Sequence, residues 1–203
     1  MITTSRTSPL LAYFAHPLAL VESDDIGNGT RIWAFAHVMS GARVGKDCNL
    51  CDHCFVESGA TLGDHVTVKN GVCIWDRVSI GDFVFVGPNA VFTNDPNPRA
   101  AIKKNRDQLA ETVVREHATI GANATIVCGV EIGRYAFVGA GAVIIRPVLD
   151  FALMVGNPAR HIGWMCACGH KLPLHQQAHD GFRFVCSHCR RSFIFAGGRP
   201  TFS

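Results

Sequence analysis

The sequence predicts an all-β protein: a parallel β-helix built from six-residue repeats, with a protruding loop and a small C-terminal module. Three observations predict it: a six-residue period of apolar residues, a small or β-branched residue four places after each of them, and glycines that recur every 18 residues. A period of six is neither the 3.6-residue period of a helix face nor the alternation of a simple strand. It fits a three-sided coil in which each hexad forms one strand and one corner.

The hexad register holds over residues 26–92 and again over 114–148. A large residue at the first position is expected to fill the interior: Ile26, Ile32, Val38, Val44, Leu50, Val56, Leu62, Val68, Ile74, Ile80, Val86, Phe92, Val114, Ile120, Ile126, Ile132, Val138 and Ile144. A smaller residue at the fifth position packs beside it: Thr30, Ala36, Ala42, Cys48, Cys54, Ala60, Val66, Val72, Val78, Val84, Ala90, Ala118, Ala124, Val130, Ala136, Ala142 and Val148. Stacked turns satisfy the backbone, because each strand pairs with the strands above and below it.

The glycines at 18-residue spacing are Gly27, Gly45, Gly63 and Gly81. Since three hexads make one turn, they fall at the same corner of successive turns. This spacing predicts a corner that needs a residue free of Cβ constraints.

The register fails between Phe92 and Val114, where prolines, asparagines and charged residues are dense. Such residues predict a loop that leaves the coil, over about 93–113. A β-helix has no concave face of its own, so a loop that reaches a neighbouring subunit is a natural way to build a pocket. The alternative is a surface excursion without a function. We therefore expect a β-helix domain over residues 1–160 and a zinc-ribbon-like module over 161–203.

Composition narrows the class of protein. Hydrophobic residues make up 48% and charged residues 17% of the 203 residues, yet no apolar run approaches the ~20 residues that span a bilayer. Residues 1–20 lack the apolar stretch and cleavage site of a secretory signal. Nine cysteines, an odd number, favour a reducing compartment over a disulfide framework. We expect a cytoplasmic protein with no membrane insertion.

The C-terminal cysteines form two close pairs separated by 17 residues: Cys166 with Cys168, and Cys186 with Cys189. This is the arrangement of a zinc ribbon, in which four thiolates bind one structural Zn²⁺ and the metal supplies folding energy. His170 or His188 could substitute as a ligand. The alternatives are a ribbon that folds without metal and a redox pair.

Several stretches resemble a known family. The hexads resemble the left-handed β-helix of the hexapeptide acyltransferases, and particular motifs look like the bacterial N-acetyltransferases of nucleotide-linked 3-amino sugars. The stretches that carry this resemblance are 29–33 (GTRIW), 87–88 (GP), 91–94 (VFTN), 97–99 (NPR), 118–126 (ATIGANATI) and 138–143 (VGAGAV). The resemblance implies left-handed coiling, acetyl-CoA as cosubstrate, and a homotrimer whose active sites lie between subunits. The sequence departs from the family pattern at two places. Similar proteins often have an aromatic residue, an acidic residue and glycine where this chain has Trp75-Asp76-Arg77, and Asp95 follows Asn94. These departures leave the identity of the acceptor sugar open.

Two residues are candidates for the chemistry. N-acetylation needs a neutral amine that attacks a thioester, and an orienting hydrogen bond suffices where an alcohol would need a general base. Asn94, where the coil passes into the loop, is expected to orient the amine, and the resemblance implies the same position; the alternative is an Asn that shapes the turn. His37 is the competing candidate, as a general base. His53, His65 and His117 fall at the fourth hexad position and are interpreted as polar corner residues.

Substrate-binding candidates lie around these positions. Arg31 and Arg99 could bind the diphosphate of a sugar nucleotide, since guanidinium groups match phosphate oxygens; the alternative is a surface salt bridge. Trp75 could stack on a base or sugar while Asp76 accepts a hydroxyl hydrogen bond; the alternative is a solvated pair. The run Gly139-Ala140-Gly141 offers unhindered backbone amides to an extended pantetheine arm, and Arg146 and Arg160 are placed to meet the adenosine phosphates.

The function that these features favour is acetyl-CoA-dependent N-acetylation of a nucleotide-linked 3-amino sugar, which the resemblance assigns to surface polysaccharide synthesis. An O-acetyltransferase with a histidine base is the first alternative. The second is a nucleic-acid-binding or scaffold protein that uses the basic C-terminal module. That module interleaves few aromatic residues with its charges, so no nucleic-acid partner is expected.

Overall fold

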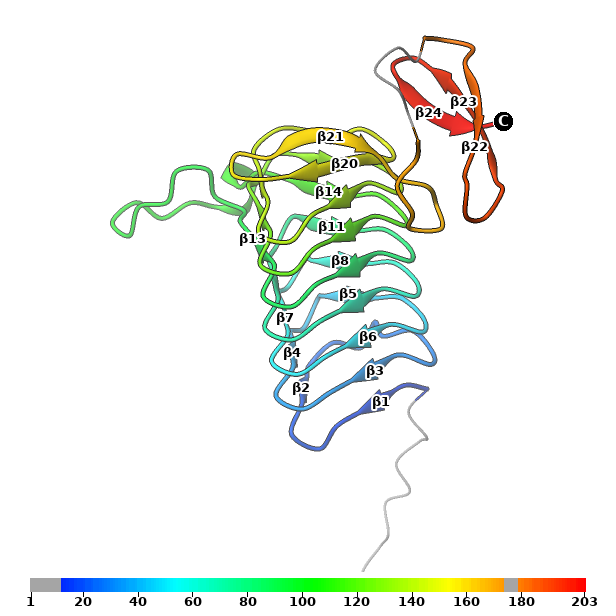
Figure 1. Cartoon of the computed structure of the whole chain (residues 1–203). Coiled ribbons are helices and arrows are strands. Elements are labelled where there is room, and N and C mark those ends of the chain that lie inside the picture. Colours follow the sequence, from blue (N-terminus) through cyan, green and yellow to red (C-terminus); the bar gives the residue numbers. More distant parts are fainter. Residues whose placement is uncertain (1–11, 174–178) are drawn as a thin grey trace, which may run out of the picture.

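The computed structural model describes residues 12–173 and 179–203, and its coil is a left-handed parallel β-helix (Figure 1). The expectation about a secretory signal falls largely on residues 1–11, which lie outside the described residues. Within the described residues, no helix is long and apolar enough to cross a membrane.

The coil has three faces, each a parallel sheet that runs along its length. Face A contains β1 (Phe14–Ala15), β3 (Arg31–Ile32), β6 (Asn49–Leu50), β9 (Thr67–Val68), β12 (Phe85–Val86), β15 (Thr119–Ile120), β18 (Phe137–Val138), β20 (Ala152–Val155) and the antiparallel β21 (Arg160–Trp164). Face B contains β2 (Leu20–Val21), β4 (His37–Val38), β7 (Phe55–Val56), β10 (Cys73–Ile74), β13 (Val91–Phe92), β16 (Thr125–Ile126) and β19 (Val143–Ile144). Face C contains β5 (Arg43–Val44), β8 (Thr61–Leu62), β11 (Val78–Ile80), β14 (Thr112–Val114) and β17 (Glu131–Ile132).

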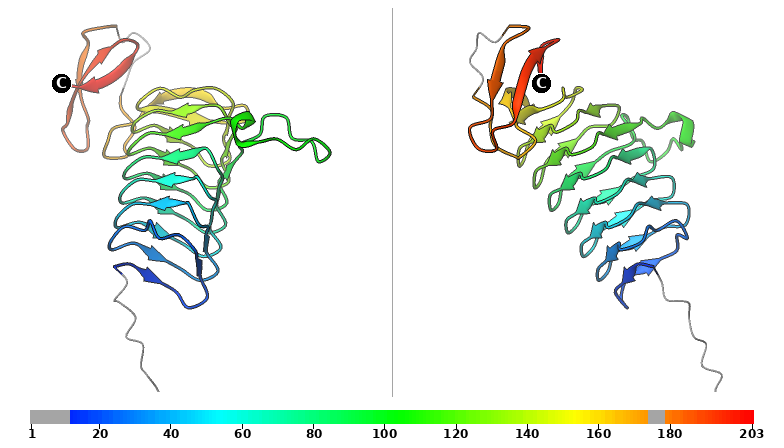
Figure 2. Two further views of the ribbon diagram at one scale, coloured as in Figure 1. Left: turned by 180° about the vertical axis from the view of Figure 1, so that it is seen from behind. Right: turned by 90° about the vertical axis from the view of Figure 1, so that its right-hand side faces the viewer.

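The register confirms a turn of three hexads. Phe55 pairs with Cys73, eighteen residues later, and the same offset recurs on every face. The offset rises to 34 where the loop is inserted between two turns, as in Val78 with Thr112, Phe85 with Thr119 and Val91 with Thr125. It falls to 17 in the first turn and to 16 in the last. The loop contains the short 3₁₀ helix η1 (Arg106–Gln108) and projects from the side of the coil opposite the C-terminal sheet (Figure 2).

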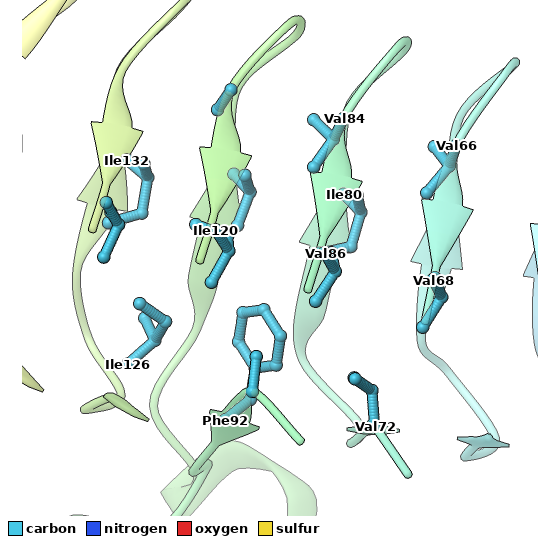
Figure 3. Close-up of a cluster of buried hydrophobic side chains, with 14 of the residues drawn as sticks. Val66, Val68, Val72, Ile80, Val84, Val86, Phe92, Ile120, Ile126 and Ile132 are labelled. Carbon is cyan, nitrogen blue, oxygen red and sulfur yellow. The ribbon is translucent and has the colours of Figure 1, made fainter. Parts of the chain in front are cut away.

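The interior contains the residues that the hexad pattern predicts. Every predicted first-position and fifth-position residue is buried except Ile26, which is half-buried beside the first turn. Aliphatic side chains of successive turns stack on one another, with Phe92 as the largest among them (Figure 3). The β-branched residues suit this interior because their stiff side chains pack well on a pleated surface.

Glycine is required at this corner for a different reason from the one that the sequence predicted. Gly27, Gly45, Gly63 and Gly81 do not have the left-handed backbone; instead a Cβ on Gly45 would lie 2.4 Å from the carbonyl oxygen of Gly63 in the next turn. The left-handed backbone occurs at the fourth hexad position, as in His53 with φ 61°. Close stacking of the turns, and not backbone conformation, therefore excludes side chains from the glycine corner.

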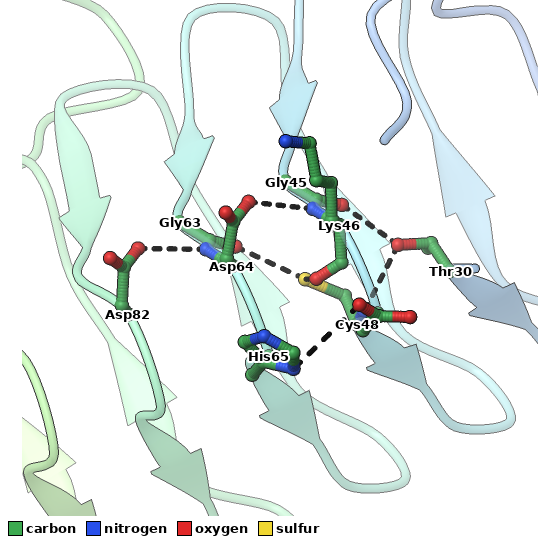
Figure 4. A network of polar contacts seen from close by, with 9 residues as sticks. Thr30, Gly45, Lys46, Cys48, Gly63, Asp64, His65 and Asp82 are labelled. Carbon is green, nitrogen blue, oxygen red and sulfur yellow. Dashed lines mark hydrogen bonds and ion pairs between the residues drawn. The ribbon is translucent and has the colours of Figure 1, made fainter. Parts of the chain in front are cut away.

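Side chains next to this corner pair with the neighbouring turn. The carboxylate of Asp64 accepts a hydrogen bond from the backbone N–H of Lys46 at 2.7 Å, and that of Asp82 accepts one from Asp64 at 2.8 Å (Figure 4). Buried Thr30 donates to the carbonyl of Gly45 and accepts from the N–H of Cys48. These contacts satisfy backbone groups that the strands leave unpaired at the corner.

An aromatic ladder follows the same corner. His65, Phe83, His117, Tyr135 and Phe151 occupy fourth positions of successive turns, and their rings stack with centroids 4.5–5.0 Å apart. This places His65 and His117 at corners, as predicted.

The C-terminal residues form a separate antiparallel sheet of β22 (Arg183–Val185), β23 (Ser192–Ala196) and β24 (Arg199–Phe202). Its Phe193 and Phe202 meet the ring of Phe151 edge-on, at the end of the aromatic ladder. The predicted domain division at residue 160 coincides with the start of β21, which returns along β20 and covers the last turn. The division itself stays a prediction.

Candidate functional site

Asn94 lies where the loop leaves the corner between faces B and C. Its backbone carbonyl accepts a hydrogen bond from the N–H of Ala110 at 2.8 Å, so the two limbs of the loop meet at this residue. Its Nδ2 donates to the carbonyl of Asp76, one turn below, at 3.4 Å. Among the described residues, Oδ1 of Asn94 has no partner. The half-buried side chain therefore presents an acceptor at the base of the loop.

Trp75 and Asp76 lie at the same corner, one turn below Asn94. The indole N–H of Trp75 donates to the carbonyl of Phe92 at 2.9 Å, and its ring packs on Phe55 with centroids 5.5 Å apart. The carboxylate of Asp76 accepts a bifurcated hydrogen bond from the Nε–H of Arg106, with Nε 2.8 Å from Oδ2 and 3.0 Å from Oδ1. Both predicted residues are thus near Asn94, and both already have partners within the chain.

The sequence did not predict a role for Arg106, because a contact between residues 30 positions apart leaves no local sequence pattern. It comes from η1 in the returning limb of the loop, and its guanidinium covers Gly59, where a Cβ would lie 3.0 Å from Nη2. The acidic group of Asp76 is 15% exposed, whereas Arg106 is largely exposed. The pair ties the loop to the coil beside Asn94.

A second ion pair lies within the loop. Lys104 pairs with Asp95 and also donates to the carbonyl of Asn97 at 3.1 Å. The hydrogen bond from Lys104 lowers the pKa of the Asp95 carboxyl. Arg99 lies further along the loop, exposed, and donates to the carbonyl of its neighbour Pro98 at 3.0 Å.

Arg31 lies in a different part of the molecule, at the corner between faces A and B near the N-terminal end. It lines a shallow hollow of about 480 Å³ together with Trp33, Asn49, Asp52 and Asn70. The indole N–H of Trp33 donates to Oδ1 of Asn49 at 2.8 Å, which orients the ring. Sequence reasoning missed these neighbours, although Arg31 and Trp33 flank the inward Ile32 and strand alternation turns both outward.

His37 also lies away from Asn94. Its Nε2 contacts a carboxylate oxygen of Glu22 at 2.9 Å, and Phe55 packs edge-on against its ring. On face B, the residues His37, Phe55, Cys73 and Val91 pair in succession. Three turns therefore separate His37 from the turn of Asn94, about 14 Å at a strand spacing of ~4.8 Å.

The run Gly139-Ala140-Gly141 lies at the corner between faces A and B, near the C-terminal end of the coil. The N–H of Gly139 donates to Met154 and that of Gly141 to Ala122, both at 2.8 Å, so the coil already uses two of the expected amides. Ala140 is exposed, and its N–H has no partner among the described residues. A Cβ on Gly141 would meet nothing within 4 Å. The open surface here is thus Ala140 and Gly141.

The structure brings Arg146 and Arg160 together, as the sequence suggested. Both line a hollow of about 200 Å³ across the end of the coil, with Met154 and His161. This hollow and the Gly139–Gly141 run lie on either side of face B. Sequence reasoning missed His161, because its place depends on the return of β21 along β20.

The four predicted cysteines gather into one cluster, with all Sγ atoms within 4.8 Å of one another. Cys166 lies 3.5 Å from Cys189 and Cys168 lies 3.7 Å from Cys186. A tetrahedral ion with Zn–S bonds of about 2.3 Å requires S–S separations of about 3.8 Å, so the thiols fit zinc. His170 contacts the sulfur of Cys168 at 3.6 Å and stacks on His188.

The thiols differ in their surroundings. Burial raises the pKa of Cys166, and its three cysteine neighbours add to the effect. Burial also opposes ionisation of Cys186, but backbone N–H groups of Cys189 and His188, together with Cys166 and Cys168, lower its pKa to about 6. All nine cysteines of the chain are free thiols.

Comparisons with known proteins agree with this architecture. Residues 111–146 match the family described as bacterial transferase hexapeptide (six repeats), and residues 41–75 match the hexapeptide repeat of succinyl-transferase. The chain is 48% identical to dTDP-3-amino-3,6-dideoxy-alpha-D-galactopyranose 3-N-acetyltransferase of Aneurinibacillus thermoaerophilus, over 91% of this chain and 92% of that protein. The chain belongs to the hexapeptide-repeat acyltransferases. Left-handed coiling, expected from the resemblance, is thereby confirmed.

More distant relatives share the fold. A variant of the N-acyltransferase AntD from Bacillus cereus, solved with dTDP-4-amino-4,6-dideoxyglucose and coenzyme A, superposes with a TM-score of 0.55 at 16% identity, covering 75% of this chain and 80% of that chain. The serine acetyltransferase of Haemophilus influenzae is 35% identical, but only over 38% of this chain and 30% of that enzyme.

Proposed function

We propose that this acyltransferase moves the acetyl group of acetyl-CoA to the amino group of a nucleotide-linked 3-amino sugar. The observation that carries the proposal is the unpartnered Oδ1 of Asn94 at the base of the loop. The extended match to a 3-N-acetyltransferase of a dTDP-linked amino sugar supports the same reaction. A dTDP-linked 3-amino-3,6-dideoxyhexose is accordingly the first acceptor to test.

Asn94 suits this reaction because a carboxamide oxygen accepts a hydrogen bond but takes no proton. Oδ1 accepts one N–H of the neutral sugar amine, which directs the nitrogen lone pair at the thioester carbonyl. The new C–N bond forms, the C–S bond breaks, and the proton that the amine loses balances the departing thiolate. A hydroxyl nucleophile would lose its proton only to a stronger base, which Asn94 does not provide.

The position of His37 argues against its role as that base. On face B it lies five turns below Val143, beside the predicted coenzyme A residues, or about 24 Å at ~4.8 Å per turn. Asn94 lies only two turns below Arg146. In a closed ring of copies whose symmetry axis runs along the coil, equivalent residues keep their height, so His37 of a neighbouring copy is equally remote.

We propose a homotrimer with sites between its subunits. Large apolar side chains project outward from faces A and B, whereas face C presents mainly polar side chains. The exposed outward residues of faces A and B include Phe14, Leu20, Phe85 and Val91. Exposed large apolar residues on two faces favour burial against other copies. In this arrangement the loop bearing Arg99 reaches a neighbour, where Arg31 and Arg99 bind the diphosphate, while Trp75 and Asp76 contact the sugar.

The acetyl donor is proposed to lie along face B. Ala140 offers its free amide to the pantetheine arm, flanked by Gly139 and Gly141, and Arg146 and Arg160 meet the phosphates in the hollow that they share. Guanidinium groups suit this role because they bind phosphate oxygens in pairs.

We further propose that Cys166, Cys168, Cys186 and Cys189 bind a structural zinc ion. Four thiolates leave no open coordination position, so the ion would stabilise the fold and take no part in catalysis. A reducing, cytoplasmic setting fits free thiols at this spacing and the synthesis of sugar precursors for surface polysaccharides.

Product analysis with two variants tests the reaction. The protein is incubated with acetyl-CoA and dTDP-3-amino-3,6-dideoxygalactose, and the acetylated sugar is measured by mass spectrometry. Asn94→Ala is expected to lower turnover by about 10²-fold, and His37→Ala to leave it within about threefold. His53→Ala, a corner histidine, serves as the matched control. Loss of turnover in His37→Ala alone would overturn the assignment.

A further inference from the structure

The four-cysteine cluster joins two segments that contact the coil in different ways. Cys166 and Cys168 lie in a hairpin that continues directly from β21. This hairpin is fixed to the last turn, because the N–H of Met165 donates to the carbonyl of Phe151, and that of Leu172 to Trp164, both at 2.8 Å. The first two ligands are thus part of the coil's end.

Cys186 and Cys189 belong to the C-terminal sheet, in the turn between β22 and β23. That sheet touches the coil through Phe193 and Phe202 against Phe151, and through an ion pair of Arg199 with Asp150 at 3.4 Å. Three strands of three to five residues are too few to form a stable core of their own. A metal held by both pairs would cross-link the sheet to the coil.

Trp164 connects this junction to the hollow at the end of the coil. It is the last residue of β21, two places before Cys166, and is 8% exposed. Its ring contacts Phe195 of the C-terminal sheet and meets the imidazole of His161 edge-on at 4.3 Å. At the other end of the same strand, Arg160 and His161 line the hollow opposite Arg146. One five-residue strand therefore links the cysteine cluster to that hollow.

We propose that the metal of the four-cysteine cluster is a positioning element for the acetyl-donor site, acting through Trp164 and β21. By fixing the sheet and the hairpin on the last turn, it holds Arg160 and His161 against Arg146, where the phosphates of coenzyme A bind. The bound metal is a thiophilic divalent ion, and four sulfurs at tetrahedral separations favour zinc. The role in coenzyme A binding rests on the proposed function.

A first experiment removes the metal from the side of the C-terminal sheet. Cys186→Ser/Cys189→Ser leaves every coil residue intact, and Cys73→Ser, a cysteine on face B, is the control. Zinc is measured by elemental mass spectrometry, and the affinities for coenzyme A and for thymidine diphosphate by calorimetry. Wild type and control are expected to hold about one zinc per chain, and the double variant almost none. Coenzyme A affinity then falls about tenfold in the double variant, while thymidine diphosphate, expected at Arg31 far along the coil, binds as before.

A second variant tests the path through Trp164. Trp164→Ala is expected to retain zinc and kcat but to raise KM for acetyl-CoA about tenfold, and Trp164→Phe to restore it. The proposal is overturned if the zinc-free variant binds coenzyme A normally, if it loses both ligands equally, if wild type holds no zinc, or if Trp164→Ala binds acetyl-CoA like wild type.

Hydrogen exchange separates this proposal from the proposed function. If wild type holds zinc but binds no coenzyme A, the acetyl-donor assignment fails, and the positioning claim is judged on exchange alone. Faster exchange over residues 151–164 in the zinc-free variant, with residues 26–74 unchanged, then supports it. Unchanged exchange over residues 151–164 contradicts it.

Discussion

The pair of Asp76 and Arg106 gives the sharpest prediction about the loop. Arg106→Gln removes a guanidinium whose Nε–H is shared between both carboxylate oxygens of Asp76, but leaves the hydrogen bonds of Asn94 with Ala110 and of Thr112 with Arg77 in place. The loop base should therefore survive while its returning limb is released. Asp76, one turn below Asn94, then loses its charged partner and keeps the hydrogen bond from the N–H of Arg77 to Oδ1, at 2.8 Å.

The expected size of the effect on KM follows from the solvent exposure of Arg106. The hydrogen bond of this pair is charge-assisted, but Arg106 is 62% exposed, so solvent screening keeps the contribution of the pair small. If this energy orients the loop over the acceptor, KM for the amino-sugar nucleotide rises about fivefold with kcat nearly unchanged. Steady-state kinetics measure both.

A matched control distinguishes this effect from general loss of charge. Arg115 pairs with Glu131 through Nε and Nη2, at 2.9 Å for both contacts, at the end of face C that is further from the loop base. Arg115→Gln is expected to leave both kinetic constants unchanged. In a double-mutant cycle, Asp76→Asn and Arg106→Gln should be non-additive. Equal effects of the two arginine variants on KM, or additivity in the cycle, would refute the reasoning.

Three further predictions concern stability and pH. Gly45→Ala places a Cβ 2.4 Å from the carbonyl oxygen of Gly63 and should lower the free energy of unfolding by well over ~1 kcal/mol. About 1 kcal/mol is expected for the control Gly198→Ala, whose Cβ meets no atom within 4 Å. Equal shifts in melting temperature for the two variants would contradict the stacking explanation. Phe92→Ala should cost about 3–5 kcal/mol in denaturant unfolding, because this fully buried ring is the largest in the coil; a cost below ~1 kcal/mol would show that the interior refills. Because Lys104 lowers the pKa of Asp95, the contribution of this pair to loop stability is complete above the ordinary carboxyl pKa of 3.8 and is lost as pH falls through the lower folded value. The protection factors of residues 95–104, which correct for the pH dependence of intrinsic amide exchange, should therefore stay constant from pH 7 to 5 and decrease below about 4, and Lys104→Met should abolish the change.

The fold was predictable because the interior of a β-helix repeats. Each hexad places one large and one smaller residue inward, so the burial of residues such as Ile74 and Val78 follows from spacing alone. The cause of the glycine corner was not predictable, because the approach of Gly45 to Gly63 depends on the distance between turns. The sequence indicated that side chains are excluded there, but not what excludes them.

The candidate site was predictable only in part. The cysteine cluster follows from spacing, since two close pairs converge readily on one ion. The separation of His37 from Asn94 was also contained in the sequence, because counting hexads from residue 37 to residue 91 gives three full turns. By contrast, the contact of Arg106 with Asp76 joins an irregular loop to a regular coil. No periodicity describes such a loop, so its partners become visible only in three dimensions.

The most direct test of the proposed N-acetylation is the choice of nucleophile by the wild-type protein. Two substrates compete for limiting acetyl-CoA: dTDP-3-amino-3,6-dideoxygalactose and the matching nucleotide sugar with a hydroxyl at C3. The products are separated, and tandem mass spectrometry locates the acetyl group in each. Acetylation of the amino sugar alone, on nitrogen, is expected. Acetylation of the hydroxyl sugar at a comparable rate, or acetylation of neither, would contradict the proposal.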